Sequence, residues 1–327
     1  MMKSISRRAF VAGLGAVGLS TSLMSGTSFA ETFPSKPVNI VVPFPAGGGG
    51  DSAVRLVSKA LSEKLKVPVN VLNKPGGDGV IGGTAVARAE PDGYTLLFAT
   101  PTAMNYAPAI HRTKPAYDPV KDFKPVSTFA SYAFVFSVNS KLPVKTLAEF
   151  VDYVHKHPGE VNYGTGDATS IIAISQFAQA AKLDMVHIPY NGGAEAEADL
   201  AANRIQAMFL TLSSIKRFGD GVNQLAVLYP ERAKVVPDLP TFKELGYASV
   251  NLLPWSGFFT TAGAPDDVVN NMSLALREVL REPKLVAIFE KFGNSIAGSE
   301  PAVLAKILDE QLVVWRHMVG VAGIKTD

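Results

Sequence analysis

The order of short apolar runs, turns and amphipathic segments constrains the fold of this chain more than any other feature. Residues 38–42 form a nearly continuous apolar run, typical of a strand buried on both faces. A turn rich in Pro and Gly follows, and apolar residues then recur at helical spacing from Val54 to Leu65. The same order repeats along the chain and predicts an α/β fold of parallel strands joined by crossover helices. Further strands are expected near residues 69–72, 94–98, 134–138, 161–163, 185–189, 205–210, 225–228 and 256–261.

Helices are expected between these strands and at the C-terminal end. Thr146 and Glu149 have the spacing of a capping box, and Asp51 is interpreted as the N-cap of the first helix. The Pro-rich stretch 115–125 is interpreted as a connection. Other helices are expected up to about residue 88, from about 169, after 193, and near 265–281 and 301–318.

Three of the predicted strands end in turns that are rich in Gly, Ser, Thr or Asn and that open a helix. These turns lie at residues 43–51, 163–170 and 189–195. Ligands of open α/β sheets lie beyond the carboxyl ends of strands, where helix N-termini present unpaired N–H donors. The three turns together predict a cradle for an anion that uses no arginine. The alternative is that each turn is only a tight connection.

The first thirty residues resemble a cleavable export signal. Ser6–Phe10 contains the twin arginines Arg7 and Arg8, residues 11–23 are apolar, and Ser28 and Ala30 are small residues at the cleavage positions. The apolar run is shorter than the roughly 20 residues of a membrane-spanning helix. We therefore expect a twin-arginine signal peptide over residues 1–30 and a periplasmic mature chain that begins near Glu31. An uncleaved anchor helix is the alternative.

The charge balance argues against a nucleic-acid partner. The whole chain has 31 basic and 29 acidic residues, but the leader contains three of the basic residues and no acidic one. The remainder therefore has 28 basic and 29 acidic residues, a net charge of −1, whereas nucleic-acid binding needs a concentrated basic surface. The chain has no cysteine, which excludes disulfides, thiolate metal sites and cysteine nucleophiles.

Sequence motifs that would indicate a nucleotide-binding, catalytic or metal site are weakly matched. Residues 48–53 match a dinucleotide-binding fingerprint in form, but prolines stiffen the turn and the second strand ends at Asn73 rather than at an acid. The chain has no G-x-S-x-G elbow, and its five histidines have no recognised catalytic context. His155 and His157 point apart on a helix, so no metal site and no cofactor are expected. Trp255 either lines a cleft or packs in the core.

Several segments resemble the substrate-binding proteins of tripartite tricarboxylate transporters, the Bug or TctC family. They span nearly the whole mature chain in the family's order. The matching segments are residues 34–37, 43–48, 91–97, 186–194, 237–244 and 262–265. This resemblance implies two α/β lobes in a Venus-flytrap (periplasmic-binding-protein) fold, with a ligand cleft between them. We expect one lobe from 31–128 and 256–327 and the other from 129–255, with no catalytic activity.

In this family the ligand's carboxylate is held by backbone N–H groups and hydroxyls of the βα turns. The resemblance implies a small organic anion as the ligand, membrane permease subunits as partners, and a monomer. A receptor for a sensor kinase is the alternative, and a periplasmic α/β enzyme is a less favoured one. The implied ligand-binding residues are Phe44, Ala46, Gly47, Gly48, Thr100 and Thr102 in the first lobe, and Thr165, Thr169, Ser170, Tyr190, Asn191 and Gly192 in the second.

One segment departs from the family pattern. The turn after Asn162 and Tyr163 is about two residues shorter than usual, lacks the family's histidine, and contains Asp167. The roles of individual residues in this turn are therefore in doubt. If the carboxylate of Asp167 faced the cleft, it would weaken the binding of a polyanion.

Overall fold

The computed structural model describes residues 33–190, 193–233, 235–252, 254–291 and 294–327. Phe33–Asp327 forms one compact unit. The expected signal peptide, residues 1–30, lies outside the described residues, as do the predicted contacts Asn191 and Gly192. Within the part of the chain that is described, no helix has the length and apolar character needed to cross a membrane.

The first sheet has six strands in the order β11-β4-β10-β3-β1-β2. The neighbours of β1 are parallel to it, whereas β10 is antiparallel to both β3 and β4. The sheet is therefore mixed, unlike the purely parallel one that was predicted. Its strands are β1 (Val38–Val42), β2 (Val69–Asn73), β3 (Thr95–Ala99), β4 (Phe123–Tyr132), β10 (Trp255–Thr261) and β11 (Asn294–Ile296).

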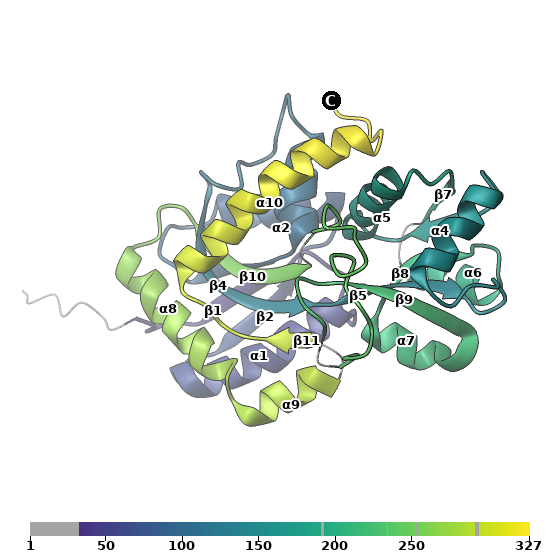
Figure 1. The fold of residues 1–327 in the computed structure, drawn as a ribbon. Helices are drawn as coiled ribbons and strands as arrows, with labels where there is room; N and C mark the ends of the chain where they lie inside the picture. The colour runs from purple at the N-terminus through teal and green to yellow at the C-terminus, as the bar shows by residue number, and fades with distance from the viewer. Residues whose placement is uncertain (1–32, 191–192, 234, 253, 292–293) are drawn as a thin grey trace, which may run out of the picture. The chain divides into compact units, whose positions relative to one another are not determined.

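Helices cover both faces of the first sheet. On one face, apolar residues of α1 and α8 join those of β1, β3 and β4 in a common core, and α9 adds Leu285 and Phe289. On the other face lie α2 and the first half of α10, together with a π-helical segment after β3. The bounds are α1 (Gly49–Leu65), α2 (Val80–Ala87), the π-helix Thr102–Tyr106, α3 (Ala107–Ile110), α8 (Asp266–Val279), α9 (Pro283–Lys291) and α10 (Pro301–Val321), with a 3-10 turn at Gly77–Gly79 (Figure 1).

The second sheet has five strands in the order β7-β6-β8-β5-β9. β6 is parallel to β7 and β8, and β5 is antiparallel to β8 and β9. The strands are β5 (Phe134–Asn139), β6 (Asn162–Thr165), β7 (Val186–Pro189), β8 (Ala207–Thr211) and β9 (Val222–Leu228).

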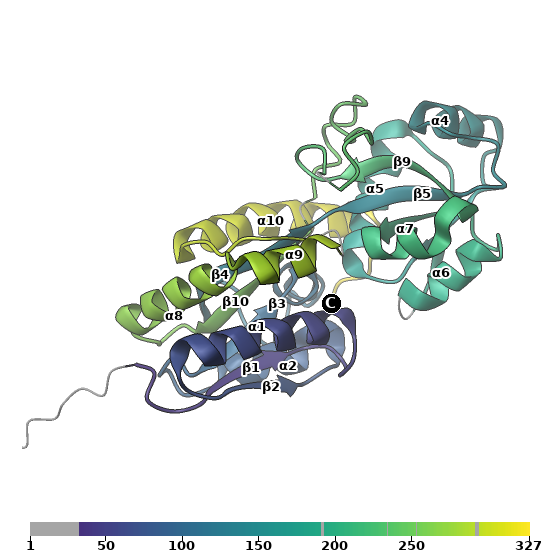
Figure 2. The ribbon, with the colours of Figure 1, turned by 90° about the horizontal axis from the view of Figure 1, so that it is seen from below.

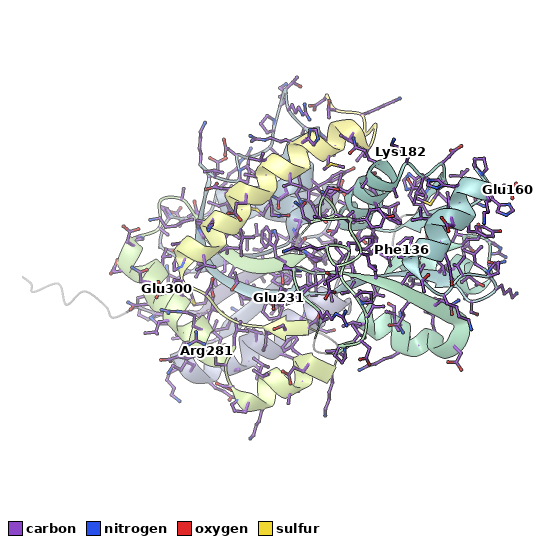
Figure 3. The ribbon with its side chains drawn as sticks, in the orientation of Figure 1. Phe136, Glu160, Lys182, Glu231, Arg281 and Glu300 are labelled. Carbon is purple, nitrogen blue, oxygen red and sulfur yellow. The ribbon has the colours of Figure 1, made fainter. Side chains whose placement is uncertain are left out.

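The second sheet is also covered on both faces. Its helices are α4 (Leu147–Lys156), α5 (Ala168–Ala181), α6 (Gly193–Ala201) and α7 (Leu212–Phe218), with a 3-10 turn at Gly219–Gly221. α4 and α5 pack on one face around the buried ring of Phe136, and α6 and α7 contribute to the core on the other face (Figures 2 and 3). The capping box predicted at Thr146 and Glu149 is confirmed, because both of its hydrogen bonds are present.

The chain passes between the sheets at two places. The long strand β4 belongs to the first sheet and is separated from β5 of the second sheet by Ala133 alone. The return from β9 to β10 runs through residues 229–254. The α/β architecture with two sheets is therefore confirmed, while the lobe boundaries at 128/129 and 255/256 stay predictions.

Several features of this fold were not predicted, among them the short helices α3 and α7. β4 includes Pro125, which sequence analysis assigned to a connection; the pairing of β4 with β10 shifts register near this proline. α9 and β11 were also missed. α10 packs Leu304 and Leu308 on the first sheet, and its later turns place Trp315 and Val319 in the core of the second.

Candidate ligand-binding site

The turn after β1 is held by the carboxylate of Asp51. This buried residue accepts hydrogen bonds from the Gly47 amide at 2.9 Å, from Nε of Arg55 at 2.9 Å and from Nδ2 of Asn73 at 2.8 Å. Gly47 has a φ of 82°, in the left-handed region that favours glycine. The Arg55 guanidinium, the Gly47 amide and Asn73 lower the pKa of Asp51 to about 2, against an opposing effect of burial.

The interpretation of Asp51 as the N-cap of α1 is wrong. The cap is Gly48, which makes no side-chain hydrogen bond, and α1 begins at Gly49. Asp51 lies in the first turn of the helix and folds back over the preceding loop. The Ser52 amide donates to the carbonyl of Gly48, so the amides of Gly49 and Gly50 lie ahead of the intrahelical hydrogen bonds.

A cavity of about 230 Å³ lies beside the start of α1. Phenyl rings form much of its wall, since Phe98 contacts Phe44 and Phe129 edge to face. Gly50 lets the Phe44 ring lie close to the helix, because a Cβ at residue 50 would be 3.1 Å from that ring. The lining residues are Phe44, Gly49, Gly50, Ala53, Phe98, Thr100, Phe129, Ala130, Tyr132, Ser256 and Asn294.

Only part of the predicted first-lobe set lines this cavity. Phe44 and Thr100 do so, whereas Ala46, Gly47 and Gly48 lie in the adjoining exposed turn. Thr102 is half-buried in the π-helix and is not a lining residue. Tyr132 and Ser256 were missed. Both come from strands at the crossings between the sheets, and no motif marked them.

In the second sheet, the hydroxyl of Thr165 faces β7. Thr165 is buried at the end of β6, and its Oγ1 lies 2.7 Å from Nε2 of His187 in a hydrogen bond. The His187 ring stacks on Tyr163 with centroids 5.0 Å apart. Burial lowers the pKa of His187, which favours the neutral imidazole near pH 7. Among the described residues no carboxylate contacts His187, so the pair lacks the third group that orients a catalytic base.

The N-terminus of α5 is capped by Asp167. One oxygen of its carboxylate accepts the Ser170 amide at 2.9 Å, and the other accepts the Ser170 hydroxyl at 2.6 Å. Thr169 and Ser170 are both buried. Asp167 is exposed as a whole residue, but the protein around its carboxyl group removes water from that group. This desolvation raises the pKa of Asp167. Hydrogen bonds from Ser170 and Thr169 act in the opposite direction and lower the pKa.

Tyr190 lies against the end of β6. Its ring is near Gly164, where a Cβ would be 3.2 Å from a ring carbon. Its hydroxyl donates to Asp199 at 2.8 Å, and Asp199 also accepts from Arg204 at 2.7 Å. Burial and the bond to Asp199 raise the pKa of Tyr190 to about 12. The phenol is therefore neutral at physiological pH and already has a partner.

Tyr132 is the last residue of β4 in the first sheet. It lines the 230 Å³ cavity, and it lies at the crossing between β4 and β5. Burial raises the pKa of its phenol, and the negative charge of Asp167 raises it further.

Three other cavities are larger than 230 Å³, and the two largest suit an anion less well. One, of about 440 Å³, is lined by Ser131, Tyr229 and the carboxylates Glu231 and Glu290 (Figure 3 labels Glu231). Among its described lining residues the one basic side chain is Arg232, which is paired with Glu244. The other, of about 470 Å³, lies between α5 and α10 and is lined mainly by amide and apolar side chains. Within the described residues, no group of His, Asp and Glu side chains has the arrangement of a metal site.

Comparisons with known proteins agree with this fold. Residues 53–324 match the model of the tripartite tricarboxylate transporter family receptor. A structure titled as a periplasmic transporter is 36% identical, with a TM-score of 0.79 over 90% of this chain and 100% of its own. A protein of Rhodopseudomonas palustris solved with adipate is 26% identical, with a TM-score of 0.79 and the same coverage.

A second Rhodopseudomonas palustris protein, MatC with bound malate, is 28% identical, with a TM-score of 0.74 over 88% of this chain and 100% of its own. The matched family model covers most of the described chain, and the solved structures match the two-sheet architecture almost in full. The chain therefore belongs to the tripartite tricarboxylate transporter receptor family, the Bug or TctC family of periplasmic solute-binding proteins, which are not enzymes.

Proposed function

We propose that this protein captures a small carboxylate in the cavity beside the start of α1 and delivers it to the membrane permease of a tripartite tricarboxylate-type transporter. One observation carries the proposal. The amides of Gly49 and Gly50 open a helix at the wall of a cavity that Thr100 and Tyr132 also line. Unpaired amides and the positive end of the helix dipole stabilise an anion without a bound cation.

Two features support a carboxylate as the ligand. The relatives solved with adipate and with malate share this fold over nearly the whole chain. The cavity also combines aromatic walls from Phe44, Phe98 and Phe129 with a hydroxyl at Thr100. This combination suits a short carbon chain that ends in a carboxylate. The phosphate-rich surface of a nucleic acid is not a suitable ligand for it.

Calorimetric titration of the mature protein tests this proposal. The probes are the dicarboxylates succinate, glutarate and adipate, their monoamides, and their uncharged diamides. Compounds with at least one carboxylate are expected to bind, and the diamides are not. Binding of the diamides as tightly as the monoamides would contradict an anion site.

A pair of variants tests whether the ligand binds in this cavity. Thr100→Val removes the hydroxyl that lines it, and a hydrogen bond to a charged group contributes roughly 1.5–3 kcal/mol. The affinity is therefore expected to fall by about tenfold to a hundredfold. Thr84→Val is the matched control, because Thr84 is half-buried on α2 and does not line the cavity. Equal affinity in both variants would show that the ligand binds outside this cavity.

The export route is part of the same proposal. Ser6–Phe10 with its paired Arg7 and Arg8 supports a twin-arginine signal. Replacing both arginines by Lys is expected to leave the precursor in the cytoplasm, as judged by cell fractionation. Normal delivery of that variant to the periplasm would refute the twin-arginine route and leave the binding function untouched.

A further inference from the structure

The cavity beside the start of α1 has aromatic walls that neighbouring rings hold in place. Phe98 and Phe129 are each only 3% exposed, and their rings meet edge to face with centroids 5.5 Å apart. Phe98 also contacts Phe44 at 6.3 Å and Phe258 at 5.8 Å. Phe129 contacts Phe289 at 5.3 Å. Because packed rings of this kind move little, the apolar wall is preorganised before a ligand enters.

The side chains that line this cavity are uncharged. Among its described lining residues there is no Lys, Arg, His, Asp or Glu. The polar side chains are those of Thr100, Tyr132, Ser256 and Asn294. The Ser256 hydroxyl donates to the carbonyl of Ala130 at 3.3 Å. A carboxylate can use the amides at the start of α1, but a second ionised group, whether carboxylate or ammonium, would have no opposite charge in the wall to pair with.

The volume of the cavity suits a single six-membered ring. It measures about 230 Å³. An apolar protein cavity of roughly 150 Å³ accommodates benzene, whereas pockets for drug-sized ligands have roughly 300–1,000 Å³. A ring that fills most of this cavity therefore leaves room for a carboxylate directed at the amides of Gly49 and Gly50, which line the same cavity.

We infer that the ligand is a small monocarboxylate with an aromatic ring, which lies against Phe44 and Phe98 while its carboxylate lies at the start of α1. This inference rests on the proposed function, because it uses the same cavity and the same amides. A ring against these side chains gains apolar burial and ring–ring contact. A linear dicarboxylate gains less apolar burial, loses the rotational freedom of several single bonds, and brings a second charge that finds no partner.

Calorimetric titration of the mature protein tests the inference with benzoate, phenylacetate, the uncharged amides of both, succinate and adipate. The tighter of the two aromatic carboxylates is expected to bind at least about tenfold more tightly than succinate, adipate or its own amide. A dicarboxylate that binds as tightly as both aromatic carboxylates would overturn the inference and leave the carboxylate receptor in place. An amide that binds as tightly as its carboxylate, or no binding of any of the four carboxylates, would overturn the proposed function and the inference with it.

A pair of variants on α1 tests where the ring lies. Ala53 is half-buried and lines the cavity, so Ala53→Leu fills part of the space for the ring with a residue that favours a helix. It is expected to weaken the binding of the tighter aromatic carboxylate at least about tenfold. Ala60→Leu is the matched control, because Ala60 is half-buried on the same helix and does not line the cavity. Its affinity is expected to equal that of the wild type, with melting temperatures showing that both variants fold. The same affinity in Ala53→Leu as in the wild type would overturn the inference.

Discussion

Ser170→Ala tests how the start of α5 is held. The variant removes the hydroxyl that donates to Asp167 at 2.6 Å, while the Ser170 amide keeps its own 2.9 Å bond to the other oxygen. A hydrogen bond to a charged group contributes roughly 1.5–3 kcal/mol. The cap itself survives, so the free energy of unfolding at pH 7 is expected to fall by an amount in the lower part of that range, about 1.5–2 kcal/mol.

The loss should depend on pH with a defined sign. Burial raises the pKa of Asp167 in the folded state, so ionisation of this carboxyl weakens the fold as the pH rises above its ordinary value. The Ser170 hydroxyl opposes this effect because it lowers the same pKa. Without it the folded pKa rises further. The deficit of Ser170→Ala should therefore be largest at the highest pH and should shrink as the pH falls through the raised folded pKa, because the hydroxyl stabilises the ionised carboxylate more than the protonated carboxyl.

Urea unfolding at pH 4, 5.5 and 7, followed by the fluorescence of Trp255 and Trp315, measures the deficit. Ser175→Ala is the matched control in the same helix, because that hydroxyl donates to the uncharged carbonyl of Ile171 at 2.8 Å. The control should change stability by less than about 1 kcal/mol at every pH. The reasoning is refuted if the two variants are equally stable at pH 7, or if the Ser170→Ala deficit does not vary with pH.

Two other substitutions test the turns. Asp51→Asn is expected to destabilise the protein at pH 7, since the folded pKa of Asp51 is depressed to about 2; this contribution is present above the ordinary pKa of 3.8 and is lost as the pH falls through the folded value. Thermal melts should therefore show wild type and variant converging between about pH 4 and pH 2, and a constant gap would contradict the linkage. Gly164→Ala would place a Cβ 2.3 Å from Ile205 and 3.2 Å from Tyr190, so overpacking should cost about 1–3 kcal/mol in urea unfolding. Gly193→Ala, where a Cβ meets nothing within 4 Å, should cost much less, and equal losses would refute the steric argument.

The local order of elements was predictable because it depends on neighbouring residues. The run 38–42 forms β1 with the predicted bounds, and the capping box at Thr146 forms as its spacing requires. The apolar run and the capping box each depend only on residues within a few positions of one another. The family was predictable for a related reason, since its motifs are short segments in a fixed order along the chain.

Features that depend on distant residues were not predictable from the sequence. β4 was missed because Pro125 and several polar residues weaken its local strand pattern, whereas the strand is held by β10 and β11, more than 120 residues further along. Trp255 could have lined a cleft, but packing against Phe259 and residues of α10 buries it.

In the candidate site, too, the position of a residue along the chain was predictable from the sequence, but the partner of its side chain was not. The sequence placed Thr165, Ser170 and Asp51 in turns that open helices. The structure puts them beside these turns, with Thr165 at the end of β6 and with Ser170 and Asp51 in the first turns of α5 and α1. The sequence could not assign their partners, because Thr165 bonds to His187 on the neighbouring strand and Asp51 reaches Asn73 on β2. Turn position follows from backbone preferences encoded locally. The direction in which a hydroxyl or carboxylate points is decided by whichever donor the folded chain brings within about 3 Å, and only the tertiary structure determines that.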